Sequence, residues 1–511
     1  VDDEGDAAGV VLETRVVQAL CGGGNLRHEG PHGSGGGRVG AGPYLRSREE
    51  GGAGSIWDAI GPDEPLTIVG GTPGCGVRSG HRSPIPAPCG ENRQDGAMQH
   101  DDVADDLLTF IDASPTPFHA VHEAAGRLAA QGFVPTAASD PAPLPAQGLV
   151  VQGGSLVAWR AGADGPHAGF RVVGAHTDSP NLRIKPKPDT GRAGFRQLAV
   201  EPYGGLLANT WLDRDLVLAG RVVVEREGTL IEQLLHLDAP VLRIPQLAIH
   251  LDRDIGEKGL KLNAQDHLAP VLAPGEQQEG AFRALLADAA GVAETDIRGW
   301  DMMCADRQPS ALIGGGTMIS APRIDNLASC HAAVQALGSA DPAQGPAVIC
   351  LFDHEEVGSV SASGAAGPLL AHTLERLAIG ADGGRPSFLA ALAQSLCISA
   401  DGAHATHPNY ADRHEPGHHI ELNAGPVLKR NENQRYATDG PGHATIAAVA
   451  DRMGVPLQQF VNRSDLPCGS TIGPVTSAQL GMTTVDLGIP QLAMHSIREL
   501  CGADDPGQLV A

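Results

Sequence analysis

The segment FRVVGAHTDSP (170–180) decides the fold class of this chain. A short, mostly apolar run is followed at once by polar, chemically capable residues, His176 and Asp178. Three further runs have the same form: AVICLF (347–352), LCISA (396–400) and TTVDLGIP (483–490). Continuous apolar runs of this length are typical of buried parallel strands, and open α/β sheets bind ligands beyond the carboxyl ends of their strands. The four runs therefore predict one sheet with reactive groups gathered at one crevice.

Helical apolar spacing lies around and between these runs, over residues 102–111, 325–340 and 443–454. Residues 182–320 differ, because their apolar segments are shorter, β-rich and separated by turn signals. We therefore expect an α/β catalytic domain in two parts, interrupted by an inserted β-rich domain. The predicted boundaries are 98–181, 182–320 and 321–511.

The first 97 residues have a different composition from the rest. They contain 23 Gly, against 44 Gly in the remaining 414 residues, and no Lys. Such a Gly content marks low complexity. A chain of this kind buries too little apolar surface to offset the conformational entropy that it would lose on folding. The segment also lacks the charged and apolar regions of a signal peptide. We expect a disordered extension, with the functional protein beginning near Met98; a regulatory tail is the alternative.

Charge and cysteine content exclude several classes of protein. The 511 residues carry a formal net charge of −24, which disfavours nucleic acid or an anionic membrane as a partner. No apolar run approaches the roughly 18 to 20 residues that a membrane helix needs. The nine cysteines form no CxxC pair, so neither a disulfide framework nor a thiolate zinc site is indicated. A reducing, cytoplasmic setting fits this composition.

The candidate functional residues are His and carboxylates that cluster in the predicted strand-end segments. Two metal ions that share a bridging carboxylate need about two more protein ligands each. Five residues satisfy that count: His176, Asp325, Glu356, Asp401 and His495. Nitrogen and oxygen ligands of this kind suit Zn²⁺, Mn²⁺ or Co²⁺.

Two acidic residues beside these ligands have no place in that count. Asp178 lies two positions after His176, close enough to orient its ring. Glu355 adjoins Glu356 and could take a proton from a metal-activated water. Each residue alone has an ordinary alternative: DHEE is usually a solvated turn, and HTD can be a capped strand end. The grouping of several such clusters is what favours a metal site.

Nine motifs lie in order and without large gaps between about residues 104 and 502: GAHTDSPNLRIKPKP (174–188), YGGLLANTWLDRDLVLAGRV (203–222), LRIPQLAIHLDRD (242–254), PRIDNLASC (322–330), DHEEVGS (353–359), ADGAHATHPNY (400–410), NQRYATD (433–439), PCGSTIGP (467–474) and PQLAMHSIREL (490–500). Together they resemble the M18 metallopeptidases, the aspartyl aminopeptidase family. Residues 1–97 have no place in this resemblance.

The resemblance implies a di-zinc exopeptidase fold, with a central mixed sheet flanked by helices and two divalent metal ions per subunit, Zn²⁺ first and Mn²⁺ or Co²⁺ as alternatives. Asp325 would bridge the metals. Glu356 and His495 would complete one site, and His176 and Asp401 the other. Glu355 would be the general base, and Asp178 the residue behind His176.

The resemblance also implies the activity and the partners. The enzyme would release an N-terminal residue from peptides, and the inserted domain would make subunit contacts in dimers that build a tetrahedral dodecamer. His250 would contact substrate in a neighbouring subunit; a satisfied His at a strand end is the alternative. Lys429, with Tyr436 nearby, would select an acidic first residue; a surface Lys is the alternative, and some family members prefer neutral or basic residues.

Three other features are weaker candidates. The sequence His414–His418 matches HExxH, but Pro416 and Gly417 oppose the helix that the motif needs, so we expect a loop. Gly314–Gly316 lacks phosphate-loop spacing and is expected to form a turn. Cys468 has no assignable base, so backbone shaping near the site by Gly469 and Gly473 is the better interpretation.

Two rival functions stay open at this point. One is a di-metal hydrolase of another amide, such as a deacylase. The other is a binding protein on an inactive peptidase fold. Glu355 and all five ligands are present, which argues against the second rival.

Overall fold

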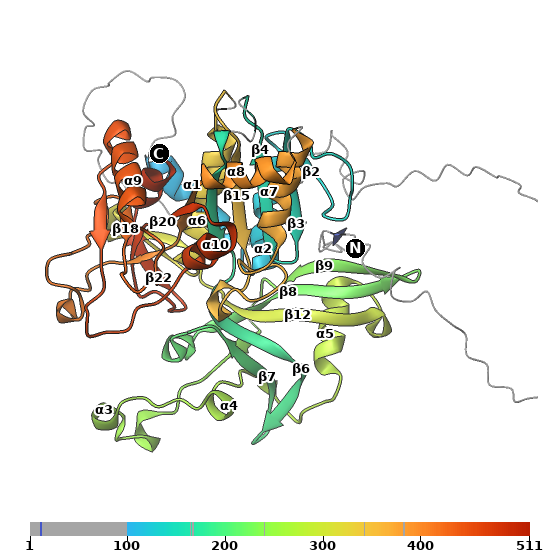
Figure 1. Ribbon diagram of the computed structural model, residues 1–511. Coiled ribbons are helices and arrows are strands. Elements are labelled where there is room, and N and C mark those ends of the chain that lie inside the picture. Colours follow the sequence, from blue (N-terminus) through green and yellow to red (C-terminus); the bar gives the residue numbers. More distant parts are fainter. Residues whose placement is uncertain are drawn as a thin grey trace, which may run out of the picture.

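The computed structural model describes residues 11–12, 100–163, 165, 168–239, 241–341, 343–381 and 384–511. The predicted disordered extension, residues 1–97, lies outside the described residues except for 11 and 12. The described chain contains two large sheets and one smaller sheet, together with helices (Figure 1).

A nine-stranded sheet forms the centre of the molecule, in the order β19-β18-β20-β16-β5-β15-β4-β3-β2. Its strands are β2 (Val134–Pro135), β3 (Gln147–Gln152), β4 (Ser155–Arg160), β5 (Arg171–His176), β15 (Ala347–Phe352), β16 (Leu396–Ala400), β18 (Val427–Lys429), β19 (Gln458–Phe460) and β20 (Thr483–Gly488). The four runs predicted as strands are β5, β15, β16 and β20, and they pair in parallel with one another. Antiparallel β4 and β18 flank them, so the sheet is mixed.

Helices cover both faces of this sheet. One layer consists of α1 (His100–Asp112), α2 (Pro117–Ala129), α6 (Ile324–Ser339) and α11 (Asp505–Val510). The other consists of α7 (Leu369–Gly380), α8 (Arg385–Ala393) and α10 (Ile472–Leu480), while α9 (Gly440–Met453) packs on β20. The predicted α/β class, with a central mixed sheet flanked by helices, is confirmed.

Alternation along the strands explains why the central runs are apolar throughout. Ile349 and Leu351 of β15 pack into the α1–α2–α6 core, whereas Val348 and Cys350 pack against α7, α8 and α10. Because both faces are covered, every side chain of β15 after the half-buried Ala347 is buried, and a fully buried aliphatic side chain contributes about 1.5–3 kcal/mol. At Gly174 a Cβ would lie 2.6 Å from Ile472 Cδ1, so this position of β5 lets α10 pack closely beside the end of the strand.

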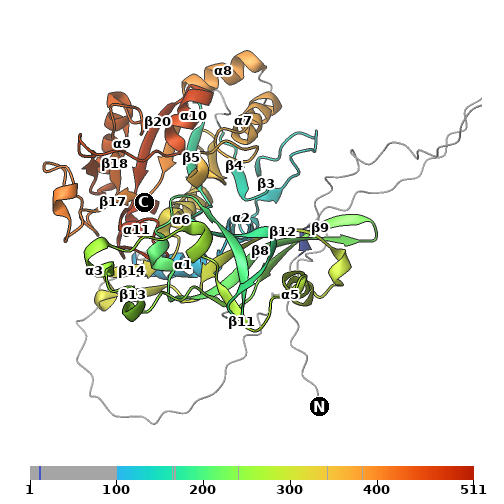
Figure 2. The same ribbon diagram turned by 90° about the horizontal axis from the view of Figure 1, so that it is seen from below.

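A second sheet of eight strands lies below the first in Figure 1, in the order β1-β9-β8-β10-β11-β7-β6-β12. Its strands are β1 (Val11–Leu12), β6 (Asn181–Arg192), β7 (Phe195–Tyr203), β8 (Asp215–Arg226), β9 (Thr229–His236), β10 (Leu242–Arg243), β11 (Val271–Pro274) and β12 (Ile297–Asp306). Since β12 pairs with both β6 and β8, the six strands β8-β10-β11-β7-β6-β12 form a closed ring, and β9 lies outside it against β8. Helix α5 (Ala281–Ala290) packs against them through Phe282 and Leu286 (Figure 2).

A third sheet connects these parts, in the order β13-β14-β22-β21-β17. Its strands are β13 (Ala311–Ile313), β14 (Met318–Ala321), β17 (Ala403–His404), β21 (Pro490–Leu492) and β22 (Glu499–Gly502). Strand β14, at the end of the predicted inserted segment, therefore pairs with β22 from the last part of the chain. The predicted domain boundaries stay a prediction.

No helix among the described residues is both long enough and hydrophobic enough to cross a membrane. All six cysteines of this part of the chain are free thiols, in agreement with the sequence. The cytoplasmic setting stays a prediction.

Candidate metal centre and active site

His176 is the last residue of β5 and lies at the carboxyl edge of the central sheet, 1% exposed. Its Nδ1 atom lies 3.0 Å from the backbone oxygen of Asp178 and 3.5 Å from Asp178 Oδ1. Its Nε2 atom is thereby directed away from Asp178, toward Asp325. A His held in this way through one nitrogen is oriented to bind a ligand through the other.

Asp178 is itself held from three sides. Its carboxylate accepts hydrogen bonds from the Tyr203 hydroxyl (2.7 Å) and from the backbone amides of Glu355 and Glu356 (3.1 Å each). Burial alone would raise its pKa, but the hydrogen bonds from His176 and Tyr203 lower it. A fixed, charged carboxylate therefore stands behind the His176 ring.

The residues after β15 form a tight turn that presents two glutamates. His354 has a φ of 68°, and the short 3₁₀ helix η7 (Glu355–Val357) follows it. Burial raises the pKa of Glu355 to about 8, helped by the nearby carboxylates of Asp401, Glu356 and Asp178 and opposed by His176. Burial also raises the pKa of Glu356 to about 7. Two buried carboxyl groups with raised pKa values are candidates for transferring a proton or for binding a cation.

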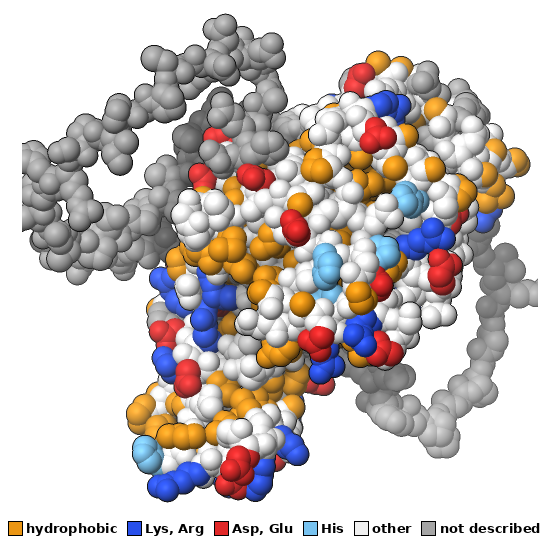
Figure 3. All heavy atoms as spheres, turned by 90° about the vertical axis from the view of Figure 1, so that its left-hand side faces the viewer, with side chains coloured by type: hydrophobic (Ala, Val, Ile, Leu, Met, Phe, Trp, Pro, Cys, Tyr) orange, Lys and Arg blue, Asp and Glu red, His pale blue; other side chains and the backbone are white. Residues whose placement is uncertain are grey.

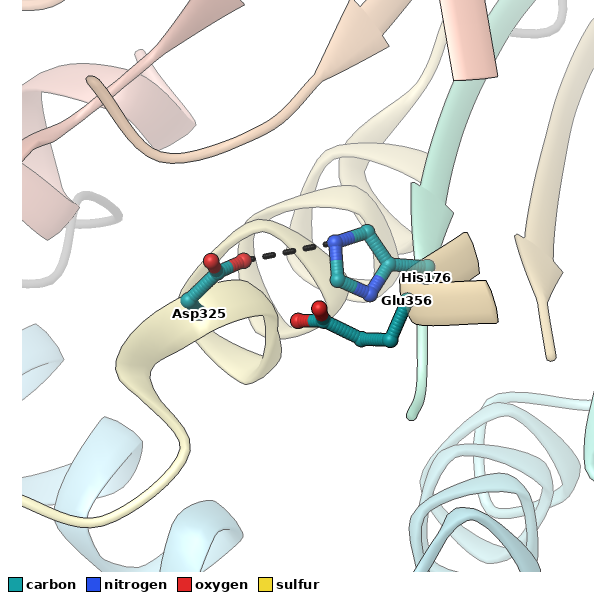
Figure 4. Close-up of side chains that lie close together, drawn as sticks. All are labelled: His176, Asp325 and Glu356. Carbon is teal, nitrogen blue, oxygen red and sulfur yellow. Dashed lines mark ion pairs between the residues drawn. The ribbon is translucent and has the colours of Figure 1, made fainter. Parts of the chain in front are cut away.

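Asp325 lies between two imidazole rings. Its Oδ1 is 3.3 Å from His176 Nε2, and its Oδ2 is 3.4 Å from His495 Nε2. Figure 4 shows Asp325, His176 and Glu356 directed toward one another. A cis peptide bond links Asp325 to Asn326, whose side-chain amide donates to the backbone oxygen of Ala400.

His495 lies in the turn between β21 and β22, 290 residues along the chain from Gly205, whose backbone oxygen is 3.2 Å from its Nδ1. Its Nε2 lies 3.3 Å from Glu356 Oε1. Burial lowers the pKa of His495, but the carboxylates of Asp325 and Glu356 outweigh this and raise it to about 11.

Asp401 follows β16 and completes the cluster. Its Oδ2 is 4.0 Å from His176 Nε2, and its Oδ1 is 3.7 Å from Lys429 Nζ. The structure therefore brings all five predicted ligands together, although they come from positions as far apart as 176 and 495.

The donor set fits divalent cations. Ligand atoms of His176, Asp325 and Glu356 lie within 4.8 Å of one another. Asp325 Oδ1 and Glu356 Oε1 are buried and have no hydrogen-bond partner. Buried carboxylate oxygens are normally hydrogen-bonded or bound to metal, and imidazole with carboxylate is a ligand set for Zn²⁺ and similar ions. A divalent cation held by these residues would use the orphaned oxygens.

An open pocket of ≈ 400 Å³ lies in front of this cluster, and Glu355, Lys429 and Tyr436 line it. Lys429 is 2% exposed, so the alternative of a surface Lys is wrong. Its Nζ donates to the backbone oxygen of Gly402 (3.0 Å) and lies 5.0 Å from the centre of the Tyr436 ring. The pocket is thus lined both by carboxylates and by a buried ammonium group.

His250 is not among the residues that line this pocket. It lies in the exposed short helix η4 (Ile249–Leu251), close in sequence to α3 (Ile255–Lys258) and α4 (Ala264–His267). Figure 1 shows α3 at the end of a segment that projects away from the central sheet, whereas α4 lies nearer β7. Within one chain, the structure does not bring His250 to the candidate site.

Two of the three weaker candidates have the local structure expected from the sequence. Residues 414–418 form a loop, in which His418 Nδ1 lies 2.5 Å from Glu415 Oε2 and His414 Nε2 accepts from the backbone amide of His407. Gly314–Gly316 forms a turn between β13 and β14, with φ above +60° at all three positions. Cys468 does not line the pocket, whereas Gly469 does.

Sequence reasoning missed several residues that shape the site. Tyr203 holds Asp178, Glu499 accepts backbone amides on both sides of the cluster, and His404 lines the pocket. Tyr203 begins the motif YGGLLANT, and Glu499 lies four residues after His495. Their position within recognised motifs could have marked them as residues near the site, but not shown which groups they contact.

The chain is similar to known proteins in both sequence and fold. A family model described as "Aminopeptidase I zinc metalloprotease (M18)" matches residues 110–511. A Streptomyces coelicolor protein named "Probable M18 family aminopeptidase 2" is 51% identical over 411 residues, which cover 79% of this chain and 94% of that protein. Among solved structures, a chain in the cryo-EM structure of the Ape4 and Nbr1 complex matches with a TM-score of 0.77 and 38% identity, covering 80% of this chain and 84% of that one. The S. cerevisiae mApe1 dodecamer matches with a TM-score of 0.71 and 30% identity, covering 80% and 95%.

Proposed function

The chain belongs to the M18 family of zinc metalloproteases and is a metal-dependent aminopeptidase, and from this premise we propose which residues hold the metals and carry the reaction. The observation that carries the proposal is the place of Asp325, with one carboxylate oxygen toward His176 and the other toward His495. A carboxylate so placed is suited to bridge two cations.

We assign two divalent ions per subunit, Zn²⁺ first and Mn²⁺ or Co²⁺ as alternatives. Glu356 and His495 complete one site with Asp325, and His176 and Asp401 complete the other. Asp178 fixes the His176 ring from behind. When bound, the cations polarise the scissile carbonyl and make a water molecule a stronger acid.

Glu355 is the general base. Its backbone amide is anchored on Asp178 Oδ1, and its side chain lines the pocket beside the proposed ligand Glu356. From there its carboxylate takes a proton from the attacking water and delivers it to the nitrogen of the leaving amine.

The carboxylates of the pocket also explain a preference for a free N-terminus. A substrate α-amino group is cationic and pairs with one of these carboxylates, which confines cleavage to the first residue. Lys429 selects an acidic side chain at that residue, because it is a buried ammonium group in the same pocket, and Tyr436 lies against it.

Self-association is the remaining part of the proposal. The mApe1 structure is a dodecamer, and its fold resembles this chain over most of its length. The exposed residues Leu247, Ile249 and Leu251, which are 57%, 57% and 75% exposed, flank His250. Figure 3 shows hydrophobic side chains gathered on the lower projecting part of this side of the molecule. We propose that the segment around His250 contacts a second copy, in dimers that build a tetrahedral dodecamer, and that His250 contacts substrate there.

Hydrolysis of a peptide panel tests the function. Peptides that begin with Asp, Glu, Leu or Lys are incubated with the protein, with the chelated protein, and after Zn²⁺, Mn²⁺ or Co²⁺ is added back. N-acetylated copies of the same peptides are the matched controls. We expect release of the first residue, Asp or Glu fastest, loss of activity on chelation and no cleavage of the blocked peptides. Faster hydrolysis of the acetylated copies would point to a deacylase instead.

Sedimentation of the purified protein, with and without His250→Ala, tests the assembly. We expect a species much larger than one chain in both samples and lower activity in the variant. A monomeric wild-type protein would contradict the proposed assembly. Full activity of the His250→Ala variant would contradict the proposed role of His250.

A further inference from the structure

Glu499, the first residue of β22, places one carboxylate between the two chain segments that carry Asp325 and His495. Its Oε2 accepts the backbone amide of Asp325 at 2.8 Å, and its Oε1 accepts the backbone amide of His495 at 2.7 Å. The side chain is buried, at 3% exposure. Each oxygen of a single buried carboxylate therefore holds one of two residues proposed as metal ligands.

The strand register explains how one side chain reaches both segments. In the β14–β22 pair, Glu499 lies opposite Ala321. Asp325 lies four residues after Ala321, and His495 lies four residues before Glu499. The turn that carries Asp325 and the turn that carries His495 therefore begin at the same end of the β14–β22 pair. The Glu499 carboxylate lies between these two turns.

The two turns have backbone conformations that need outside support. Arg323, in the turn before Asp325, has a φ of 56°, and His495 itself has a φ of 68°. Residues with a side chain adopt this left-handed region at a cost, and they remain there when surrounding contacts enforce it. The hydrogen bonds to Glu499 are contacts of that kind, because they fix the amide of His495 and the amide of Asp325 directly.

We infer that Glu499 is a positioning residue, which sets the separation between the Asp325 carboxylate and the His495 ring and thereby the affinity for the cation held by both. The two side chains are 3.4 Å apart at Asp325 Oδ2 and His495 Nε2. Glu499 does not line the ≈ 400 Å³ pocket, so it acts through the backbone of its two partners. This inference rests on the proposed metal-dependent function.

The chemistry requires a carboxylate at this position. Glutamate has two acceptor oxygens, whereas glutamine has one acceptor and one donor group. In Glu499→Gln, an NH₂ group would face either the amide of Asp325 or the amide of His495. One of the two hydrogen bonds would be replaced by two donors in contact, at nearly unchanged side-chain volume.

The test is a Co²⁺ titration of the metal-free full-length protein, followed by visible absorption and by competition with a chelator. We expect Glu499→Gln to bind Co²⁺ about 10- to 100-fold more weakly at one of two sites, with a changed absorption band. Asp189→Asn is the matched control. Asp189 also accepts one backbone amide on each oxygen, from Gly280 and Phe282 at 2.9 Å, but it lies in β6 of the eight-stranded sheet. We expect its Co²⁺ affinity and spectrum to match the wild type.

Wild-type Co²⁺ affinity and spectrum in Glu499→Gln would overturn the inference, as would an equal loss in Asp189→Asn. If Glu499→Gln does not fold, Glu499→Asp takes its place, because it keeps two acceptor oxygens but draws them back by one methylene. We expect weaker Co²⁺ binding there too, and unchanged binding would overturn the inference. Absence of any Co²⁺ band in the wild type is a different result, which would overturn the proposed function itself.

Discussion

The hydroxyl of Tyr203 donates a hydrogen bond to Asp178 Oδ2 over 2.7 Å, so the last residue of β7 touches the carboxylate that stands behind His176. The guanidinium of Arg183, on the neighbouring strand β6, lies 4.0 Å from the centre of the same Tyr ring. The eight-stranded sheet therefore does more than lie beside the central sheet. It supplies part of the network that orients a proposed metal ligand.

Replacing Tyr203 with Phe removes only this hydroxyl. The Asp178 carboxylate keeps its two backbone donors but loses its side-chain donor, so the His176 ring is held less firmly. We expect metal affinity or activity to fall by about tenfold, with the fold intact. Zn²⁺ competition titration and steady-state kinetics measure this. Unchanged values in both would show that the contact has no role in orienting His176.

Glu355→Gln keeps the size of the side chain and removes its ability to accept a proton. We expect kcat to fall by about 10²- to 10⁴-fold while the metal content stays at the wild-type level. Metal analysis of the purified variant is essential, because a loss of metal would explain the same fall in activity. A variant that retains metal and more than a tenth of wild-type kcat would exclude Glu355 as the base.

Lys429→Met removes the buried ammonium group of the pocket and keeps much of its volume. Loss of one partner of a buried charged pair costs about 2 kcal/mol or more, which is roughly a 30-fold change. We expect kcat/KM on Asp-terminated peptides to fall by at least about that factor, and on Leu-terminated peptides far less. The ratio of the two substrates is the informative quantity, since Lys429 also lies 3.7 Å from Asp401. An equal loss on both substrates would discard the role in specificity.

A stability prediction concerns Asp106 of α1, far from the pocket in sequence. Its carboxylate accepts from Arg127 and Gln335 and lies 2.7 Å from His331 Nε2. The hydrogen bond with His331 and the charge of Arg127 lower its pKa, against the effect of burial. A lowered pKa means that the folded state binds its proton less readily than the unfolded state. The stabilisation is therefore complete above about pH 4, the unfolded value, and is lost as the pH falls further.

Asp106→Asn should accordingly lower the free energy of unfolding by about 1–2 kcal/mol at pH 7, with a smaller difference below pH 4. Denaturant unfolding at several pH values measures this. Asp105→Asn is the matched control, because Asp105 is the exposed neighbour on the same helix. A difference that grows as the pH falls would contradict the assignment.

The central sheet and the first part of the site followed from local patterns in the sequence. The apolar runs that became β5, β15 and β16 are buried on both faces, and such burial leaves a clear signal at the level of single residues. His176 and Asp401 lie at or directly after two of these strands. The helices expected over 102–111, 325–340 and 443–454 correspond to α1, α6 and α9.

Other features depend on contacts between distant segments, which no local pattern encodes. His495 does not follow β20 directly but lies beyond β21, in a turn of the third sheet. Tyr203 reaches Asp178 from a strand of the other large sheet, and Glu499 reaches Asp325 across 174 residues. The family resemblance could place His495 by its motif, but the supporting role of Tyr203 and Glu499 required coordinates.

The equal four-residue offsets of Asp325 from Ala321 and of His495 from Glu499 have a consequence for evolution. Surface loops commonly gain or lose residues without harm. Here a single inserted residue within 322–324 or 496–498 would displace either Asp325 or His495. The two side chains would then no longer face each other, even though neither residue had been substituted. Homologous genes that preserve the enzyme should therefore show indels elsewhere and a constant length in these two turns.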